Sequence, residues 1–188
     1  MNKRLSIILN TLFNRRGFTL VELLVSMTVF MIIASVMVAN FRKGADRDDL
    51  QQGALLITSL LQQAQTYALA GYALAGTVPA GGYGLYLDIN NPTKVVFFAD
   101  SDGDSNYDNP GELVASWQYS MPPKVVIQSL IPNSPVTYTF RPPQGNRYLN
   151  GALNSGSLIV VVQHQRTLER LQVTANAVSG QVNISALQ

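Results

Sequence analysis

An apolar run near the N-terminus constrains this sequence more than any other feature. The 24 residues from 18 to 41 contain a single charged side chain, Glu22. At about 1.5 Å per residue, a helix of this length spans roughly 36 Å, enough to cross a hydrocarbon core of ~30 Å. The run therefore predicts one membrane-spanning helix.

The charges before the run indicate its orientation. Residues 1–17 hold four basic side chains and no acidic one, namely Lys3, Arg4, Arg15 and Arg16. Basic segments beside a spanning helix stay on the cytoplasmic side. We therefore expect a single-pass protein of the cytoplasmic (inner) membrane, with its N-terminus in the cytoplasm and the bulk of the chain exported.

Two simpler explanations account for less of this segment. A secretory signal peptide has an apolar region of about 7–15 residues followed by a small-x-small cleavage site. Here the run is longer, and the candidate site at Met37–Ala39 contains a bulky Met. A plain membrane anchor explains the length of the run but not its carboxylate, which is costly in a bilayer and implies a partner.

The residues that open the run form a specific pattern. The basic pair Arg15 and Arg16 precedes Gly17 and Phe18, and Glu22 is the fifth residue counted from Phe18. With the apolar run behind it, this segment resembles the cleavage and methylation motif of type IV prepilins and type II secretion pseudopilins.

That resemblance implies how the chain is processed and with what it associates. A prepilin peptidase/methyltransferase would remove residues 1–17 as a leader peptide by cutting between Gly17 and Phe18, and would methylate the new α-amine of Phe18. The other implied partners are further pilins or pseudopilins and an inner-membrane assembly platform. The expected function is that of a structural subunit, which leaves the membrane for a type IV pilus or a type II secretion pseudopilus.

Cleavage would give Glu22 a role in assembly. In a filament both the new amine of Phe18 and the carboxylate of Glu22 lose water, and pairing them offsets that loss. The two residues lie four positions apart on the same face of one helix, so the partner of Glu22 is better sought on another copy. The alternative is a glutamate whose carboxylate only reaches the lipid headgroups.

The helix is expected to continue past the membrane. Residues 45–70 repeat apolar side chains at steps of three and four, the pattern of an amphipathic helix. Gly44 and Gly53 each weaken a helix by about 1 kcal/mol relative to Ala, so a bend would fall at one of them. We expect one helix from about Phe18 to about Gly71.

The remainder of the chain has the composition of a β domain. Short runs rich in Val, Ile, Tyr and Phe alternate with turn residues after Gly71. The predicted strands are Gly84–Asp88, Lys94–Ala99, Leu113–Tyr119, Lys124–Leu130, Val136–Arg141, Ser157–His164, Leu168–Ala175 and Gln181–Ser185. The predicted fold is α+β and pilin-like: a long N-terminal helix, transmembrane in its first half and amphipathic in its second, packed on a C-terminal antiparallel β-sheet domain. Its expected segments are a leader (1–17), a transmembrane or filament-core helix (18–41), an amphipathic half-helix (42–71) and the β domain (72–188).

Two later segments refine the resemblance. Val136–Phe140 leads into Arg141–Gly145, and Leu171–Thr174 leads through a Ser-Gly turn into Gln181–Ile184. These segments look like the strand–turn–strand patterns of the GspH/FimT-like family of minor pilins and minor pseudopilins.

An acidic loop follows the second predicted strand. Acidic or amide side chains occupy alternate positions at Asp100, Asp102, Asp104, Asn106 and Asp108. Oxygen ligands at this spacing can wrap Ca²⁺, which makes these five residues the candidate metal ligands and Ca²⁺ the only candidate cofactor. The loop is not an EF-hand, because that motif needs Gly at position six and Glu at position twelve. The competing interpretation is a plain turn, which favours the same residue types.

The sequence carries no pattern that predicts an enzyme. It has no cysteine and one histidine, which excludes thiol chemistry and a multi-histidine metal site within one chain. His164 is interpreted as a rim residue at a strand end, and Asp46, Asp48 and Asp49 as a solvated turn.

The net charge of +2 depends on the basic residues of the expected leader. Without residues 1–17 the chain has nine basic and eleven acidic side chains. This balance argues against nucleic acid as a partner, since phosphate binding needs clustered Lys and Arg. The basic residues available to the β domain are Lys94, Lys124, Arg141, Arg147, Arg166 and Arg170. Two alternatives stay open: a minor pilin that captures DNA for uptake, and a surface adhesin stiffened by calcium.

Overall fold

The computed structural model describes residues 18–108, 111–153 and 156–187. It divides into two compact units, the first ending at Lys43 and the second beginning at Gly44. Within the described residues, one helix, α2 (Leu20–Ala70), is long and apolar enough to cross a membrane. Gly17 and the rest of the expected leader lie outside the described residues.

Both ends of α2 are capped by local hydrogen bonds. At the start, the Thr19 hydroxyl accepts a hydrogen bond of 3.2 Å from the backbone N–H of Glu22, as an N-cap residue does. At the end, Gly71 adopts a φ of +59°, and Tyr72 N–H donates to the carbonyl of Tyr67 at 3.0 Å. This is a Schellman ending, which needs the left-handed conformation that glycine supplies.

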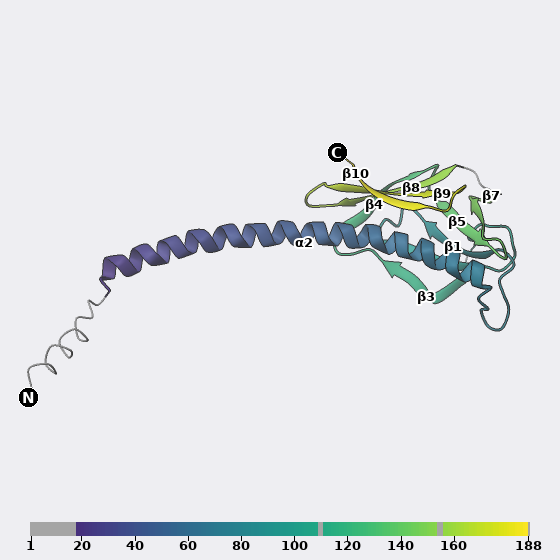
Figure 1. Cartoon of the computed structure of the whole chain (residues 1–188), viewed down its shortest axis with the longest axis horizontal. Coiled ribbons are helices and arrows are strands. Elements are labelled where there is room, and N and C mark those ends of the chain that lie inside the picture. The colour runs from purple at the N-terminus through teal and green to yellow at the C-terminus, as the bar shows by residue number, and fades with distance from the viewer. Residues whose placement is uncertain (1–17, 109–110, 154–155, 188) are drawn as a thin grey trace, which may run out of the picture. The chain divides into compact units, whose positions relative to one another are not determined.

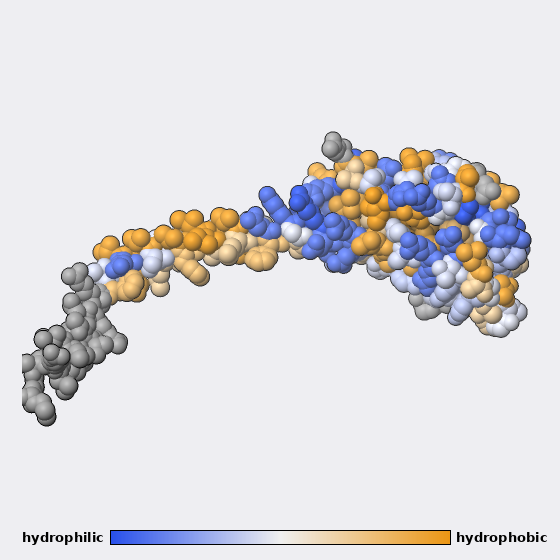
Figure 2. Space-filling view, viewed as in Figure 1, coloured by the Kyte–Doolittle hydropathy of each residue, from blue (hydrophilic) through white to orange (hydrophobic). Residues whose placement is uncertain are grey.

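The part of α2 in the first unit exposes its apolar side chains along its length, from Leu20 at 79% to Phe41 at 78%, and Phe18 just before it is 74% exposed. Figure 2 shows this stretch as a mostly apolar surface. Because such a surface is unfavourable in water, it requires lipid or other protein chains around it.

The second unit combines the remaining part of α2 with two antiparallel sheets (Figure 1). The six-stranded sheet has the order β3-β2-β1-β5-β6-β7, and the four-stranded sheet has the order β10-β9-β8-β4. The strands are β1 (Gly82–Leu87), β2 (Lys94–Asp100), β3 (Leu113–Ser120), β4 (Val125–Ile131), β5 (Val136–Arg141), β6 (Asn146–Leu149), β7 (Ala152–Leu153), β8 (Ser157–His164), β9 (Arg170–Asn176) and β10 (Val182–Leu187).

One apolar core joins α2 to both sheets. The stripe predicted from the sequence is buried on α2, and it packs with side chains from each sheet. Gly53 marks the closest approach, since a Cβ at that position would lie 2.9 Å from Cγ1 of Val125 on β4. The glycine is therefore explained by packing.

The predicted fold class is confirmed, and the strand pattern needs two additions. Each of the eight predicted strand segments is a strand, and no predicted boundary differs from the observed one by more than two residues. The two short strands β6 and β7 were not predicted. They hold four and two residues, and turn residues such as Asn150 and Gly151 separate them, so no period-two pattern could reveal them.

Candidate functional site

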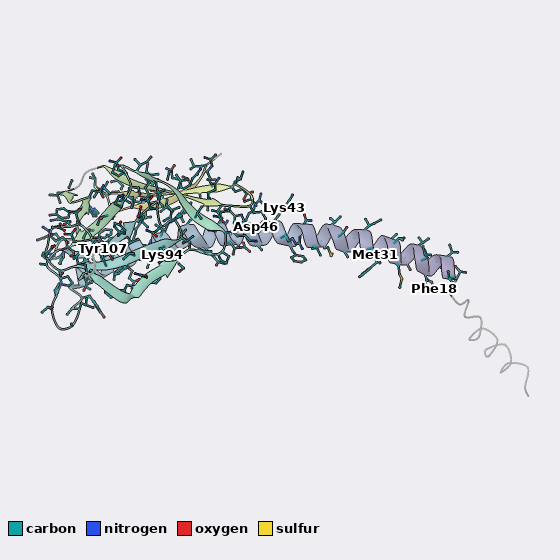
Figure 3. All side chains as sticks on the ribbon, turned by 180° about the vertical axis from the view of Figure 1, so that it is seen from behind. Phe18, Met31, Lys43, Asp46, Lys94 and Tyr107 are labelled. Atoms are coloured by element: carbon teal, nitrogen blue, oxygen red, sulfur yellow. The ribbon has the colours of Figure 1, made fainter. Side chains whose placement is uncertain are left out.

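The predicted processing and assembly residues lie at the start of α2. Phe18 is exposed, and Glu22 is an exposed acidic residue in the first turn of the helix. Figure 3 labels Phe18 at this end of the described chain. The other predicted cleavage residue, Gly17, lies outside the described residues.

Thr19 adds a residue that the sequence analysis missed. Its hydroxyl caps the backbone N–H of Glu22, and the spacing Thr-x-x-Glu is the sequence signature of a capping box. In a complete capping box the glutamate carboxylate would accept from the backbone N–H of the N-cap residue, but among the described residues the Glu22 carboxylate has no hydrogen-bond partner. The side chain is left available for a group outside this helix.

The acidic loop joins β2 to β3 and folds around its own backbone. Asp100 is fully buried, and its two carboxylate oxygens accept hydrogen bonds of 2.7 Å from the backbone N–H groups of Gly103 and Ser105. Glu112 is also buried, and its oxygens accept 3.1 Å bonds from the N–H groups of Ser101 and Asp108. These two carboxylates hold the loop as turn residues do.

The predicted metal ligands fall into two groups that share Asp102. In one group Asp100 and Asp102 meet Glu112, and in the other Asp102 meets Asp104 and Asp108; within each group the ligand atoms lie within 4.8 Å of one another. The predicted ligand Asn106 belongs to neither group. Glu112 was not predicted, and the signal that could have found it is its position twelve residues beyond Asp100.

Charge and burial disfavour ionisation in this loop. Burial is the main cause that raises the pKa of both Asp100 and Glu112, against the lowering effect of their backbone hydrogen bonds. The exposed Asp108 also has a raised pKa, mainly through the nearby charge of Asp104. The loop thus concentrates negative charge that its own backbone donors offset only in part.

A second ionisable cluster was misread from the sequence. Asp46 is buried, so its interpretation as part of a solvated turn is wrong, and Figure 3 labels it on α2. Its Oδ1 lies 3.5 Å from Nε2 of His164, and its Oδ2 accepts a hydrogen bond from the guanidinium of Arg166. His164 is fully buried and is therefore not a rim residue. Its Nδ1 accepts a 3.3 Å bond from the N–H of Thr167, which assigns the ring proton to Nε2, facing Asp46.

Structural contacts occupy three of the basic side chains that a DNA-binding surface would need. Arg141 donates to the carbonyl of Gly103 and the hydroxyl of Ser105, Arg147 donates to backbone carbonyls near the start of the β9–β10 turn, and Arg166 pairs with Asp46. The arginines serve mainly to hold loops, which leaves few charges for phosphate contacts.

Comparison with known protein families gives a match at the start of the chain. Residues 12–38 match the prokaryotic N-terminal methylation motif. The chain carries a pilin-type N-terminus. This class of protein is processed by prepilin peptidase, assembles with other pilins and is structural rather than catalytic. The motif and the apolar helix together support a membrane-anchored, pilus-associated protein. The match ends at Val38, and no curated protein or solved structure matches the chain.

Proposed function

We propose that this chain is a minor pilin or pseudopilin, made as a membrane-held precursor and then assembled into a type IV pilus or a type II secretion pseudopilus. The observation that carries the proposal is the exposed apolar half of α2, in which the one carboxylate, Glu22, lies within the methylation motif matched over residues 12–38. In the membrane, lipid covers this surface. In a filament, the same surfaces of neighbouring subunits cover one another.

The chemistry of assembly would centre on two groups. Cleavage between Gly17 and Phe18 exposes an α-amine at Phe18, and methylation leaves that amine able to carry its positive charge. The carboxylate of Glu22 in an adjacent subunit would pair with this amine as both leave water. The exposed carboxylate of Glu22 supports this role, because it has no hydrogen-bond partner among the described residues and can therefore bind outside its own helix.

The finer placement in the GspH/FimT-like group draws support from two turns. The segment Arg141–Gly145 joins β5 to β6, and Gly145 adopts a φ of +67°, which favours glycine. Gly180, with a φ of +74°, lies in the turn between β9 and β10. The glycines of both resembling segments therefore occupy positions that need them.

Mass spectrometry of the mature N-terminus tests the processing step. Co-expression of the full chain with a prepilin peptidase should give a product that begins at Phe18 and carries one added methyl group. A product that begins at any other residue would contradict the proposal.

A matched pair of variants tests the assembly step. Glu22→Gln keeps the shape of the side chain but removes its charge, so the variant should still be cleaved while its recovery in sheared filaments falls at least tenfold. Ser26→Ala, one turn further along α2, removes a hydroxyl that bonds only within the helix and should assemble normally. Equal incorporation of both variants would rule out the charge pairing.

A further inference from the structure

A polar hollow of about 480 Å³ lies on the face of the six-stranded sheet that is turned away from the core. Its floor is a row of three cross-strand neighbours, Tyr86 on β1, Val96 on β2 and Gln118 on β3. Lys94 lies two residues before Val96 and therefore on the same face. The remaining lining residues come from two loops: Asp88, Asn91, Tyr107 and Asp108.

The acidic loop forms one wall of this hollow. Tyr107 packs with its ring centroid 4.8 Å from that of Tyr86 and 5.3 Å from that of Phe98. Glu112 accepts the backbone N–H of Asp108 and so holds the chain directly after this tyrosine. Gly84 leaves space for the ring of Phe98, on which Tyr107 packs, since a Cβ at position 84 would lie 2.8 Å from that ring. The wall is therefore packed in place before any ligand arrives.

The polar groups of the hollow include both donors and acceptors that remain available. Among the described residues, the side chains of Lys94 and Gln118 and the hydroxyls of Tyr86 and Tyr107 have no hydrogen-bond partner. Each phenol hydroxyl can donate one hydrogen bond and accept another. Lys94 and Tyr107 are labelled on the β domain in Figure 3.

We propose that this hollow binds a neutral saccharide of one or two rings. A sugar ring offers an apolar C–H face, which the Tyr86–Tyr107 wall can cover, and a rim of hydroxyls that both donate and accept. Gln118 and Lys94 supply side-chain partners for that rim at the floor and edge of the hollow.

The charges in the hollow favour a neutral ligand over an ion. A cation would face the ammonium group of Lys94. An anion would face the carboxylates of Asp88 and Asp108. The Asp88 carboxylate is already engaged, because its oxygens accept bonds from Asn90, Asn91 and Ser134. Neither sign of charge therefore finds an unopposed partner.

Saturation-transfer NMR on the full chain in phospholipid nanodiscs tests this site. The probes are lactose, maltose and N,N′-diacetylchitobiose, and nanodiscs avoid detergents with sugar headgroups. At least one sugar should receive saturation from the protein. Binding to chitin beads provides a second test. If the beads retain the chain while free diacetylchitobiose binds only weakly, the saccharide that the hollow binds belongs to a polymer.

Variants locate the binding. Tyr107→Ala removes the wall and should weaken binding at least tenfold. Gln118→Ala, an exposed surface change that should leave the fold intact, removes one hydrogen bond and should weaken binding about fivefold. Lys124→Gln, an exposed lysine outside the hollow, should bind like the unaltered chain.

Three results would overturn the proposal. One is the absence of saturation for all three sugars. Another is binding that both Tyr107→Ala and Gln118→Ala leave unchanged. The third is Tyr107-dependent binding of tetramethylammonium or sulfate in place of the sugars, which would make the hollow an ion site. None of these variants touches Phe18 or Glu22, so failure here is separable from failure of filament assembly.

Discussion

The carboxylate of Asp46 lies 3.5 Å from Nε2 of His164, and this contact ties α2 to the last residue of β8. Arg166 closes the other side of the same carboxylate. Since Asp46 and His164 are both buried, the cluster places a negative charge and a ring N–H together inside the second unit. It links segments more than 100 residues apart in the sequence.

Removal of the Asp46 carboxylate should destabilise the second unit. Breaking a fully buried pair costs about 3–5 kcal/mol, but Arg166 is 44% exposed and can be hydrated, so we expect a smaller loss for Asp46→Ala. An unfolding free energy lower by about 1–3 kcal/mol is the expected result. Asp48→Ala, an exposed aspartate two residues along α2, should change the unfolding free energy by less than about 0.5 kcal/mol. Urea unfolding of the full chain, followed by circular dichroism, makes the comparison, and equal effects would mean that the cluster does not contribute.

The two glycines of α2 should respond to alanine in opposite directions. Gly44→Ala meets no atom within 4 Å and should stabilise the helix by about 1 kcal/mol through propensity. Gly53→Ala gains the same propensity, but its Cβ would lie 2.9 Å from Cγ1 of Val125 and 3.1 Å from Cε of Met121. Overpacking of this kind costs about 1–3 kcal/mol, so the net effect should be a loss. Thermal unfolding of the two variants side by side measures the sign, and a higher Tm for Gly53→Ala would show that β4 moves aside easily.

Two buried tyrosines of neighbouring strands offer a similar contrast. The hydroxyl of Tyr83 donates to the carbonyl of Tyr72 at 2.6 Å, whereas the hydroxyl of Tyr138 is buried with no hydrogen-bond partner among the described residues. Tyr83→Phe should therefore lower the unfolding free energy by about 1 kcal/mol, and Tyr138→Phe should raise it by about 1 kcal/mol or more. Urea unfolding at pH 7 distinguishes the two, and equal losses would show that Tyr138 has a partner in solution.

The same tyrosines predict a dependence on alkaline pH. Burial is the main cause that raises the pKa of Tyr83 and of Tyr138 to about 12. Tyrosines of the unfolded chain ionise near pH 10 while these two stay neutral in the folded chain, so the unfolding free energy is unaffected by them below pH 10 and falls as the pH rises from 10 towards 12. Tyr138→Phe should flatten the fall of Tm between pH 10 and pH 12. An unchanged slope would assign the alkaline transition to other groups.

The sequence was most informative where neighbours along the chain determine structure. The apolar stripe from Leu50 to Ala68 predicted the buried face of α2, because helical periodicity is a local property. Gly71, and the change after it to short β-branched and aromatic runs separated by turn residues, marked the end of that helix. The acidic loop was likewise located from its turn residues alone.

Long-range contacts account for what the sequence could not predict. Nothing near Asp46 in the sequence reveals that Arg166, 120 residues away, will neutralise it. The polar hollow also depends on strand register, since Tyr86 and Gln118 come together only when β2 pairs with both β1 and β3. Such contacts depend on topology, which one-dimensional patterns leave open.

Calcium binding by the acidic loop stays a prediction, and the geometry makes its test specific. Asp100 and Glu112 are buried and use both carboxylate oxygens to accept backbone N–H groups, whereas Asp102, Asp104 and Asp108 are exposed to solvent. This exposed trio is therefore the place where added Ca²⁺ should act. Millimolar Ca²⁺ should raise the Tm of the full chain, because it relieves the repulsion that raises the pKa of Asp108. Asp104→Asn should remove that increment and, in calcium-free buffer, should itself raise the Tm by removing one of the repelling charges. Asp48→Asn, on the exposed side of α2, should leave the calcium effect intact. A Tm that does not respond to Ca²⁺ would leave the loop as a turn held by its own carboxylates.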